Sequence, residues 1–331
     1  MLRKKIVTFG GGTGHFYLLD GLKRYVYPPF ITATVGSWDS GGSSGRLRTE
    51  LGVLPPGDIR RCILALMEDQ DQQRVAQRLF NDRLDDAQGK LKGHAFGNLI
   101  GARLDHLFRG QDRGTDAERA LFRIRAKIVP ACLTDLQLSA VTEKGITIEG
   151  EDGIDNRCKR SDFDSKDKIV RIHFQTRADA NPDVLEAIKD AGKIIFSPGD
   201  LFTSILPHLL IDGVREAICA SKAKIYFVLN IMTKPGETDG FAASNFLEKF
   251  AFYLGDKNRP DYVIANNGRI NPSIASIYRA EGQEVVTMDE QRCRIALPKA
   301  KIVKAKLAKY LIKEHLLRHD SDHLVKAILG L

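Results

Sequence analysis

The first strand-like run of the chain ends in a glycine-rich loop, and this junction constrains the fold more than any other feature. In IVTFGGGTGHFYLL (6–19), an apolar run meets three consecutive glycines, a threonine and a fourth glycine before the sequence becomes hydrophobic again. Glycines at such a turn let the backbone approach a ligand closely. The helix that follows would aim its free backbone N–H groups and its positive end at the loop. We therefore predict that the loop contacts a phosphate or a nucleotide, in preference to a tight packing turn.

Seven strand-like runs alternate with amphipathic helical patterns along the chain. In NPDVLEAIKDAG (181–192), for example, Asn181 is a suitable N-cap, Pro182 suits the first turn and Gly192 suits the exit. Alternating strands and helices imply right-handed crossovers and a mainly parallel sheet with helices on both faces. The seven runs are Lys5–Phe9, Ile31–Gly36, Ile169–Phe174, Lys193–Phe196, Ile225–Asn230, Tyr262–Ala265 and Glu284–Met288.

One segment departs from this alternation. LQLSAVTEKGITIE (136–149) has two alternating runs around a turn at 143–145, which predicts an inserted β-hairpin. The Asp-rich stretch 151–168 is predicted to be a loop, and the polar helical stretch 69–93 a flap over one edge of the sheet. Because the composition shows no strong break, we expect a single nucleotide-binding domain spanning residues 1–331.

Composition excludes several classes of protein. Five scattered cysteines without a C-x-x-C pair argue against a disulfide framework and a zinc site. No apolar run reaches the length of a membrane span, and MLRKK leads directly into a strand without a secretory signal, so we expect the cytoplasm. The net charge is +8, much of it in the stretch 298–318. There the lysines alternate with aliphatic residues and no aromatic platform accompanies them, which favours a solvated helix or strand face over a nucleic-acid surface.

The loop after the second strand favours an anion. SWDSGGSSGRLR (37–48) combines Asp39 with hydroxyl groups, bare backbone and the guanidinium groups of Arg46 and Arg48. A dehydrogenase would use an acidic residue at this strand end to hold a ribose, but the arginines weaken that interpretation. The glycine loop itself matches neither the G-x-G-x-x-G fingerprint nor a P-loop.

The remaining loops add polar candidates. Asp58, after a Pro-Pro-Gly turn, is expected to cap the helix that begins at Ile59, with a Mg²⁺ site shared with Asp39 as the alternative. Asp200 and Thr203 follow the turn at Pro198 and Gly199, where N-capping is again an alternative to ligand binding. In LNIMTKPGETDGF (229–241), the asparagine and first threonine could read a base or a sugar, while the acidic residues could bind a metal or cap a helix.

Taken together, these loops resemble a known family. GGGTG, DSGGSSGRLRTELGVLPPGDIRRCILAL, GHAFGNLIGARL, SPGDLFTSILPHLL, LNIMTKPGETDGF, YRAEGQEVV and RHDSDHLVKAIL occur in the order expected of the YvcK (gluconeogenesis factor) branch of the CofD-like family. The resemblance covers nearly the whole chain. It implies a Rossmann-like three-layer αβα sandwich, which agrees with the alternating pattern.

The resemblance also implies a function. YvcK-like proteins are cytosolic, bind UDP-sugars such as UDP-N-acetylglucosamine, and support gluconeogenic growth and cell shape. The CofD branch is instead 2-phospho-L-lactate transferase, which acts in deazaflavin coenzyme biosynthesis with metal-binding aspartates in its cleft. Asp39 falls where both branches place an acidic residue.

The chain departs from the family pattern at two positions. Ser40 follows Asp39 where the family usually has a second aspartate, which weakens a two-aspartate metal site. Asp200 stands where the family usually has serine after Gly-Pro-Gly, which puts a negative charge near the expected phosphate.

We therefore expect a UDP-sugar-binding regulatory protein, with a CofD-like transferase as the alternative and the enzymatic question left open. No cofactor is required on this interpretation; the alternative is Mg²⁺ held by Asp39 and Asp58. A nucleotide diphosphate ligand is the expected partner, nucleic acid and a membrane span are not expected, and a homo-oligomer is allowed. The residues expected to bind the ligand are Gly10, Gly11, Gly12, Thr13, Gly14, Asp39, Gly41, Gly42, Ser43, Ser44, Arg46, Asp58, Arg60, Asn98, Pro198, Gly199, Asp200, Thr203, Asn230, Thr233, Glu237, Thr238 and Asn266.

Overall fold

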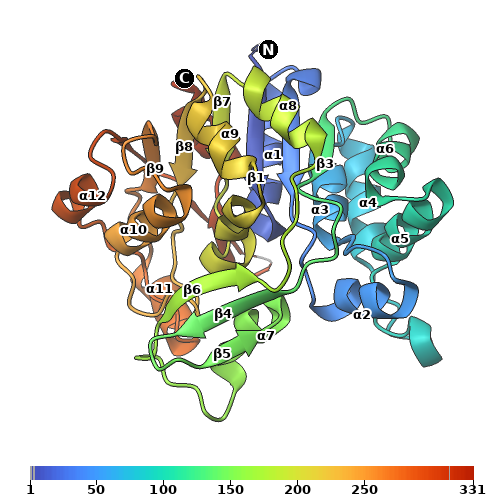
Figure 1. Cartoon of the computed structure of the whole chain (residues 1–331), viewed down its shortest axis with the longest axis horizontal. Helices are drawn as coiled ribbons and strands as arrows, with labels where there is room; N and C mark the ends of the chain where they lie inside the picture. Colours follow the sequence, from blue (N-terminus) through green and yellow to red (C-terminus); the bar gives the residue numbers. More distant parts are fainter. Residues whose placement is uncertain (1, 3, 313) are drawn as a thin grey trace.

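A seven-stranded sheet runs through the centre of the computed structural model, which describes residues 2, 4–312 and 314–331 (Figure 1). The strand order is β10-β9-β8-β7-β1-β2-β3, and every neighbouring pair is parallel. The α/β class predicted from the alternating pattern is confirmed. The strands are β1 (Ile6–Gly10), β2 (Ile31–Val35), β3 (Lys127–Pro130), β7 (Lys193–Phe196), β8 (Lys224–Val228), β9 (Tyr262–Asn266) and β10 (Lys301–Ala305).

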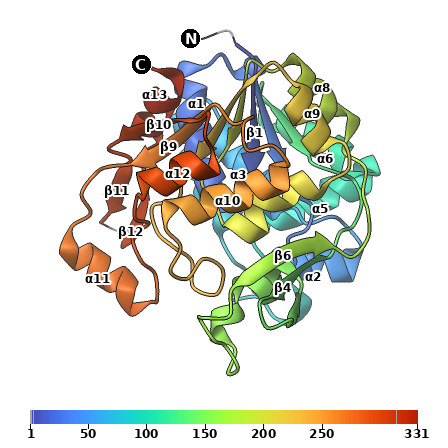
Figure 2. The same ribbon diagram turned by 60° about the vertical axis from the view of Figure 1, so that its left-hand side comes forward.

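Helices cover both faces of this sheet (Figure 2). In β1, Ile6 packs into an apolar cluster with α1, α3 and α13, while Val7 and Phe9 belong to a second cluster with α8, α9 and α10. Successive side chains of a strand point to opposite faces, so a strand buried on both sides must be apolar throughout. This requirement explains why the central strands were visible in the sequence. The helices named are α1 (Gly12–Tyr25), α3 (Gly57–Leu66), α8 (Pro182–Asp190), α9 (Val214–Ala220), α10 (Ala243–Leu254) and α13 (Ser321–Leu329).

The order of the strands reverses between β1 and β7. From β1 the chain adds β2 and β3 on one side, and from β7 it adds β8, β9 and β10 on the other. When the loops that follow two neighbouring strands run in opposite directions, a crevice forms beyond the carboxyl ends of the two strands. Open α/β sheets bind their ligands in this crevice. The loops after β1 and β7 therefore define the place to look for a site.

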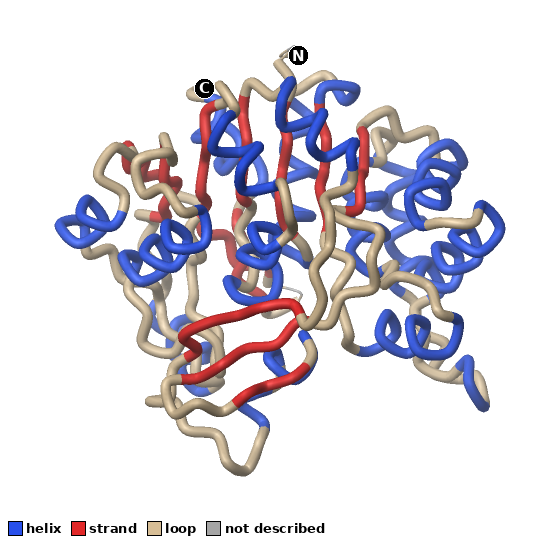
Figure 3. The backbone as a smooth tube through the Cα atoms, in the orientation of Figure 1, coloured by secondary structure: helices blue, strands red, loops and turns tan. Residues whose placement is uncertain are grey.

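The predicted hairpin is part of a separate antiparallel sheet. β4 (Leu138–Thr142) pairs with β5 (Thr147–Glu149) on one side and with β6 (Ile169–Phe174) on the other. In Figure 3 this small sheet lies below the carboxyl ends of the central strands. The hairpin prediction is confirmed, but the run 169–174, predicted within the main series of strands, completes the insert instead.

Several other expectations fail for identifiable reasons. The run 284–288 forms no strand; it lies beside the loop after β8, where Val285 makes an isolated bridge with Met232. The stretch 151–168 is not all loop, since it begins with the short helix α7 (Glu151–Asp155). The sequence missed both edge strands of the central sheet, β3 and β10, and also the antiparallel pair β11 (Ala308–Leu311) and β12 (Leu316–His319). β10 is partly exposed, so it lacks the continuous apolar run of a buried parallel strand. β3 is largely buried, but its run is only four residues long.

The remaining elements lie around this framework, and no helix among the described residues is long and apolar enough to cross a bilayer. α4 covers half of the stretch predicted to be a polar helical flap, and it packs through Ala76 and Phe80 on the face of α1 and α3. The elements are α2 (Gly42–Leu51), α4 (Gln70–Asn81), α5 (Phe96–Phe108), α6 (Gln111–Leu121), α11 (Pro272–Ala280), α12 (Glu290–Ala296), β11 (Ala308–Leu311), β12 (Leu316–His319) and helical turns at Pro28–Phe30, Gly89–Leu91, Arg157–Lys159, Leu201–Ile205 and Leu206–Leu210.

Two of the four loop glycines are required by packing between the loops after β1 and β7. A Cβ at Gly10 would lie 2.0 Å from Ser197 Oγ, and a Cβ at Gly14 would lie 1.9 Å from the Pro198 carbonyl oxygen. Real side chains never approach backbone so closely. The glycines therefore let the two loops pack against each other at the point where the strand order reverses.

Gly14→Ala is expected to destabilise the protein by about 1–3 kcal/mol, the usual cost of overpacking. A loss of stability would be diagnostic of the close contact, because replacing glycine by alanine inside a helix otherwise stabilises a protein by about 1 kcal/mol. Urea unfolding followed by circular dichroism measures the change. Gly153→Ala is the matched control, since its Cβ would make an ordinary 3.6 Å contact with Ile148 Cγ2. Equal stability of Gly14→Ala and wild type would show that the loops are not in contact.

Candidate functional site

Two polar cavities meet at the glycine loop. The first, of about 320 Å³, is lined by helix α7 of the insert and is called the acidic cavity; the second, of about 250 Å³, is lined by β12 and is called the C-terminal cavity. Both are lined by Gly12, Thr13, Asp200 and Ser204, so they flank the same loop. Small-molecule sites typically occupy about 300–1,000 Å³, so the first cavity is at the lower end of this range and the second is slightly below it.

Most of the residues predicted from the sequence line one of these cavities. Those in the acidic cavity are Gly12, Thr13, Asp39, Gly41, Gly42, Ser43, Ser44, Asp58, Arg60, Asn98, Asp200 and Thr203. Those in the C-terminal cavity are Gly11, Gly12, Thr13, Gly14, Pro198, Gly199, Asp200 and Asn230. The predicted residues that line neither cavity are Gly10, Arg46, Thr233, Glu237, Thr238 and Asn266.

The anion nearest the glycine loop belongs to the protein itself. The backbone N–H of Gly12 donates to Asp58 Oδ1 at 2.8 Å, and a Cβ at Gly11 would lie 2.4 Å from Asp58 Oδ2. The expectation that Asp58 caps its own helix is wrong: α3 begins at Gly57 without a side-chain cap. The carboxylate instead faces the positive end of α1, and Arg61 donates to it at 2.8 Å. A phosphate bound here would have to share this end of α1 with a carboxylate.

Asp39 and Asp58 lie close together, which the alternative of a shared Mg²⁺ site requires. Both line the acidic cavity. Burial, together with the negative charge of Asp58, raises the pKa of Asp39, although the Gly41 N–H donates to its carboxylate at 2.9 Å. A divalent cation between the two carboxylates would relieve their repulsion, so the pair is chemically suited to Mg²⁺. Whether Asp39 and Asp58 hold a metal stays a prediction.

Ser40 joins the loop after β2 to the inserted helix α7. Its backbone N–H donates to Glu151 Oε2 at 3.3 Å, and its hydroxyl oxygen accepts the N–H of Asp152 at 3.0 Å. A serine makes these two hydrogen bonds without adding charge beside Asp39. The departure from the family pattern at this position thus has a structural role in attaching α7.

Helix α7 supplies three carboxyl groups that the sequence analysis missed. Glu151, Asp152 and Asp155 all line the acidic cavity. Burial and the charges of Asp39 and Asp155 raise the pKa of Glu151 to about 9, so this carboxyl is protonated at neutral pH. The signal was present as EDGID directly after the hairpin, but nothing local indicated that the insert folds back over the carboxyl ends of β1 and β2.

Three arginines face the acidic cavity, and they are not the pair expected from the loop after β2. Arg60, Arg61 and Arg83 line it. Burial and the neighbouring charges of Arg61 and Arg83 lower the pKa of Arg60 to about 10, an unfavourable crowding that a bound anion would relieve. The exposed side chain of Arg46 donates instead to the carbonyl of Lys92 at 2.9 Å. The structure therefore places Arg60 where Arg46 was expected.

The wall opposite α7 carries neutral hydrogen-bonding groups. From α5, the Asn98 amide approaches Ser44 Oγ at 3.4 Å, while Ser43 Oγ lies 3.0 Å from His94 Nδ1. These contacts link α2 to α5. The asparagine and serines predicted from separate motifs are thus brought together by packing of two helices.

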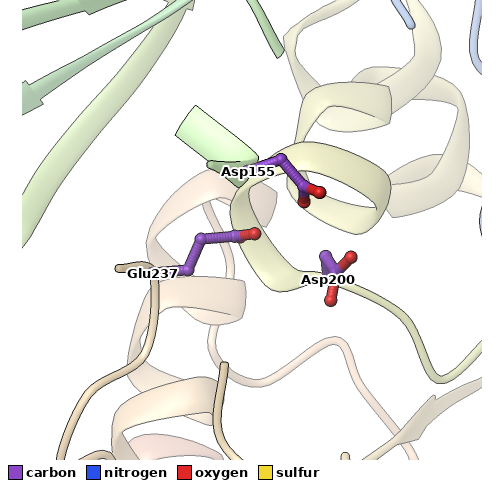
Figure 4. A group of neighbouring side chains, drawn as sticks. All are labelled: Asp155, Asp200 and Glu237. Atoms are coloured by element: carbon purple, nitrogen blue, oxygen red, sulfur yellow. The ribbon is translucent and has the colours of Figure 1, made fainter. Parts of the chain in front are cut away.

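The loop after β8 contributes a charged cluster rather than a ligand-reading surface. The buried carboxyl of Glu237 accepts the N–H of Phe202 at 3.2 Å and the hydroxyl of Thr203 at 3.3 Å, so it binds the start of the turn after β7 instead of capping α10. Burial and the charge of Asp200 raise the pKa of Glu237, while the ammonium group of Lys234 opposes this shift. Its carboxylate lies with those of Asp155 and Asp200 around a common space (Figure 4).

Three predicted polar residues are engaged by the backbone. Thr233 Oγ1 accepts the N–H of Glu284 at 2.8 Å, and Thr238 Oγ1 accepts the N–H of Lys234 at 2.8 Å. The amide oxygen of Asn266 accepts three backbone N–H groups, including that of Leu307 at 2.9 Å. These contacts give the three side chains a structural role at loop junctions. Asn230 differs, since it donates to the Gly199 carbonyl and also lines the C-terminal cavity.

The C-terminal cavity has an aromatic and cationic wall that sequence reasoning did not single out. Tyr17, Tyr278, Gln283, Arg318 and His319 line it together with the glycine loop. These residues come from α1, from α11 and the loop that follows it, and from β12, which are far apart in the chain. Because no single motif contains them, only the tertiary fold shows that they share a cavity.

Comparison with known proteins agrees with this geometry. The family model described as 2-phospho-L-lactate transferase CofD matches residues 6–308. The chain belongs to this family. Within it, the chain belongs to the gluconeogenesis-factor (YvcK) branch. It is 38% identical over 330 residues to a putative gluconeogenesis factor from Thermoanaerobacterium thermosulfurigenes, covering 99% of this chain and 96% of the relative.

Other relatives give the same result. The gluconeogenesis factor of Bacillus subtilis is 33% identical over 330 residues, covering 99% of this chain and 98% of the relative. The crystal structure of a protein from Bacillus halodurans superposes with a TM-score of 0.90 at 33% identity, covering 99% of this chain and all of that one. The three-layer fold implied by the resemblance is therefore confirmed for this CofD-family member.

The protonation of Glu151 predicts a pH dependence of stability. Because folding raises its pKa from about 4.5 to about 9, the native state holds the proton more tightly, and the stability gained is lost as pH rises through that window. Glu151→Gln keeps the group neutral, so the melting temperature of the variant should rise relative to wild type between pH 5 and pH 9. Thermal unfolding monitored by fluorescence measures this. The control is Glu149→Gln at an exposed position, whose melting temperature should change with pH as that of wild type does. If the melting temperature of Glu151→Gln also ran parallel to that of wild type across this pH range, the raised pKa of Glu151 would be contradicted.

Proposed function

We propose that this CofD-family protein is a cytosolic nucleotide-sugar-binding protein of the YvcK type, which takes a UDP-sugar such as UDP-N-acetylglucosamine and regulates gluconeogenic growth and cell morphogenesis. The observation that carries the proposal is the meeting of two different cavities at one glycine loop. A nucleoside diphosphate sugar has the same plan: two chemically different ends joined by a diphosphate. The kinship with gluconeogenesis factors supports the regulatory role.

The diphosphate is assigned to the shared wall. The N–H of Gly12 is taken by Asp58, but Thr13 and Gly14 belong to the same first turn of α1, whose N–H groups have no partner within the helix. The crowded arginines of the acidic cavity supply the cationic charge. The tyrosines of the C-terminal cavity offer flat surfaces suited to a base.

The charge of the acidic cavity is largely balanced within the protein. Glu151 is protonated, Asp58 pairs with Arg61, and Asp155 and Asp200 pair with Lys234. Among the described residues, Asp39 and Asp152 have no cationic side chain within ion-pair distance. Asp39 is therefore suited to accept hydrogen bonds from sugar or ribose hydroxyl groups without a metal.

The second candidate is a transferase. The matched family model bears the name of 2-phospho-L-lactate transferase, and the repelling pair Asp39 and Asp58 is suited to a Mg²⁺ that would balance a transferring phosphate. The experiment that separates the candidates joins calorimetry with UDP-N-acetylglucosamine to a transferase assay with lactyl-phospho-guanosine donor and deazaflavin acceptor. We expect binding without turnover. Turnover without UDP-sugar binding would reverse the ranking.

Arg60→Lys should weaken UDP-sugar binding by tenfold or more. Lysine keeps the charge but lacks the planar fork, and a charge-assisted hydrogen bond contributes about 1.5–3 kcal/mol. Calorimetry measures the affinity, with Arg46→Lys as the control because Arg46 lines neither cavity. Should Arg60→Lys prove unstable in thermal unfolding, the exposed Arg83→Ala tests the same cluster. A larger loss of affinity in Arg46→Lys than in Arg60→Lys would instead indicate that the diphosphate binds near the loop at 92–93.

Binding of the UDP-sugar is expected to be independent of Mg²⁺ and to fall sharply in Asp39→Asn. An asparagine still accepts one hydrogen bond but loses the charge that strengthens it. The measurement is UDP-sugar affinity in Mg²⁺ and in EDTA, for wild type and variant. Strict Mg²⁺ dependence that disappears in Asp39→Asn would support the transferase instead.

A further inference from the structure

The ammonium group of Lys234 lies among three carboxyl groups from three separate segments. It forms ion pairs with Asp155 on α7, with Asp200 in the loop after β7 at 2.8 Å, and with Glu237 in its own loop at 3.6 Å. Figure 4 shows the three carboxyl groups turned toward one another. One side chain thus joins the inserted sheet to the central fold at the wall of the acidic cavity.

The three carboxyl groups have the spacing of metal ligands. One oxygen from each lies within 4.8 Å of the others. Two ligand atoms that each lie 2.0–2.6 Å from a divalent cation are about 3–5 Å from one another. The three carboxyl groups therefore have the spacing of a coordination site, and the ammonium group of Lys234 binds all three of them in place of a metal ion. Burial lowers the pKa of Lys234, but the charges of Glu237, Asp200 and Asp155 outweigh this effect and raise it.

The cluster also explains how Asp200 is accommodated. This aspartate lines both cavities and adds a negative charge beside the glycine loop. Lys234 neutralises that charge across 34 positions of sequence. The same lysine contacts Asp155, at the end of the short helix whose start is held by Ser40 through Glu151 and Asp152.

We propose that Lys234 is a positioning residue that does the work of a divalent cation: it holds α7 against the loop after β7 and so keeps Glu151 and Asp152 in the wall of the acidic cavity. The effect of Lys234 on ligand binding rests on the proposed function. Its role in holding α7 does not depend on that function. Removing the ammonium should convert the three carboxylates into a metal site.

The first test is Mn²⁺ binding, measured by electron paramagnetic resonance on wild type and Lys234→Met. Methionine keeps the length of the side chain and removes its charge. We expect the variant to bind one more Mn²⁺ per chain than wild type, whatever wild type binds at Asp39 and Asp58. The matched control, Asp200→Ser/Lys234→Met, removes one ligand as well and should lose the added Mn²⁺. No added Mn²⁺ in Lys234→Met would overturn the proposal.

The second test follows the attachment of α7 by hydrogen exchange of the amides at 150–156, which needs no UDP-sugar. Lys234→Met should speed exchange at Asp152 by tenfold or more, and Mn²⁺ should slow it again in this variant but not in the Asp200→Ser double variant. A merely structural loss of the lysine would not be rescued by a metal ion. Unchanged exchange in a folded Lys234→Met would overturn the positioning role.

Calorimetry then separates this proposal from the proposed function. UDP-sugar affinity should fall in Lys234→Met and recover with Mn²⁺. If wild type binds no UDP-sugar while Mn²⁺ still restores α7, the proposed function fails and the role of Lys234 stands. If wild type binds UDP-sugar but Mn²⁺ restores nothing in the variant, the role of Lys234 fails and the proposed function stands.

Discussion

The contact between the loops after β1 and β7 is the constraint on which the rest of the site depends. These strands are neighbours, and the chain leaves them in opposite directions. A side chain at Gly14 would collide with the Pro198 carbonyl, so the loops can meet only through bare backbone. That contact directs the start of α1 toward Asp58, and it places Asp200 on the wall shared by both cavities. Gly10 and Gly14 are therefore needed for packing, whatever the loop binds.

Charge pairing explains how so many carboxyl groups can gather at one sheet edge. Asp58 is paired with Arg61, Lys234 serves Asp155 and Asp200, and Glu151 stays protonated. Without these partners, mutual repulsion would push the inserted sheet away from the central fold. The insert thus remains attached by the same interactions that leave Asp39 available to a ligand. Folding and the proposed ligand binding would use one set of charges, so a variant of either partner should affect both.

The sequence predicted the centre of the sheet better than its edges. Lys193–Phe196 coincides with β7, because a strand buried on both faces needs a continuous apolar run. β10 alternates lysine with apolar residues at the exposed edge, a pattern that a solvated helix or strand shares. Hydrophobic patterning also found β6 but not its partner, since a run of apolar residues does not specify which strand it will pair with.

For the site, the sequence by itself determined which loops carry polar chemistry, because glycine, serine and aspartate at strand ends are local signals. It determined the family as well, since the motifs and their order are properties of the chain. Only the tertiary structure decided that Arg60 and not Arg46 faces the cavity, that Asp58 binds the glycine loop, and that α7 lines the acidic cavity together with Asp39. The direction of a side chain depends on the element packed against it. Here those elements lie tens of residues apart, so no local pattern could contain the answer.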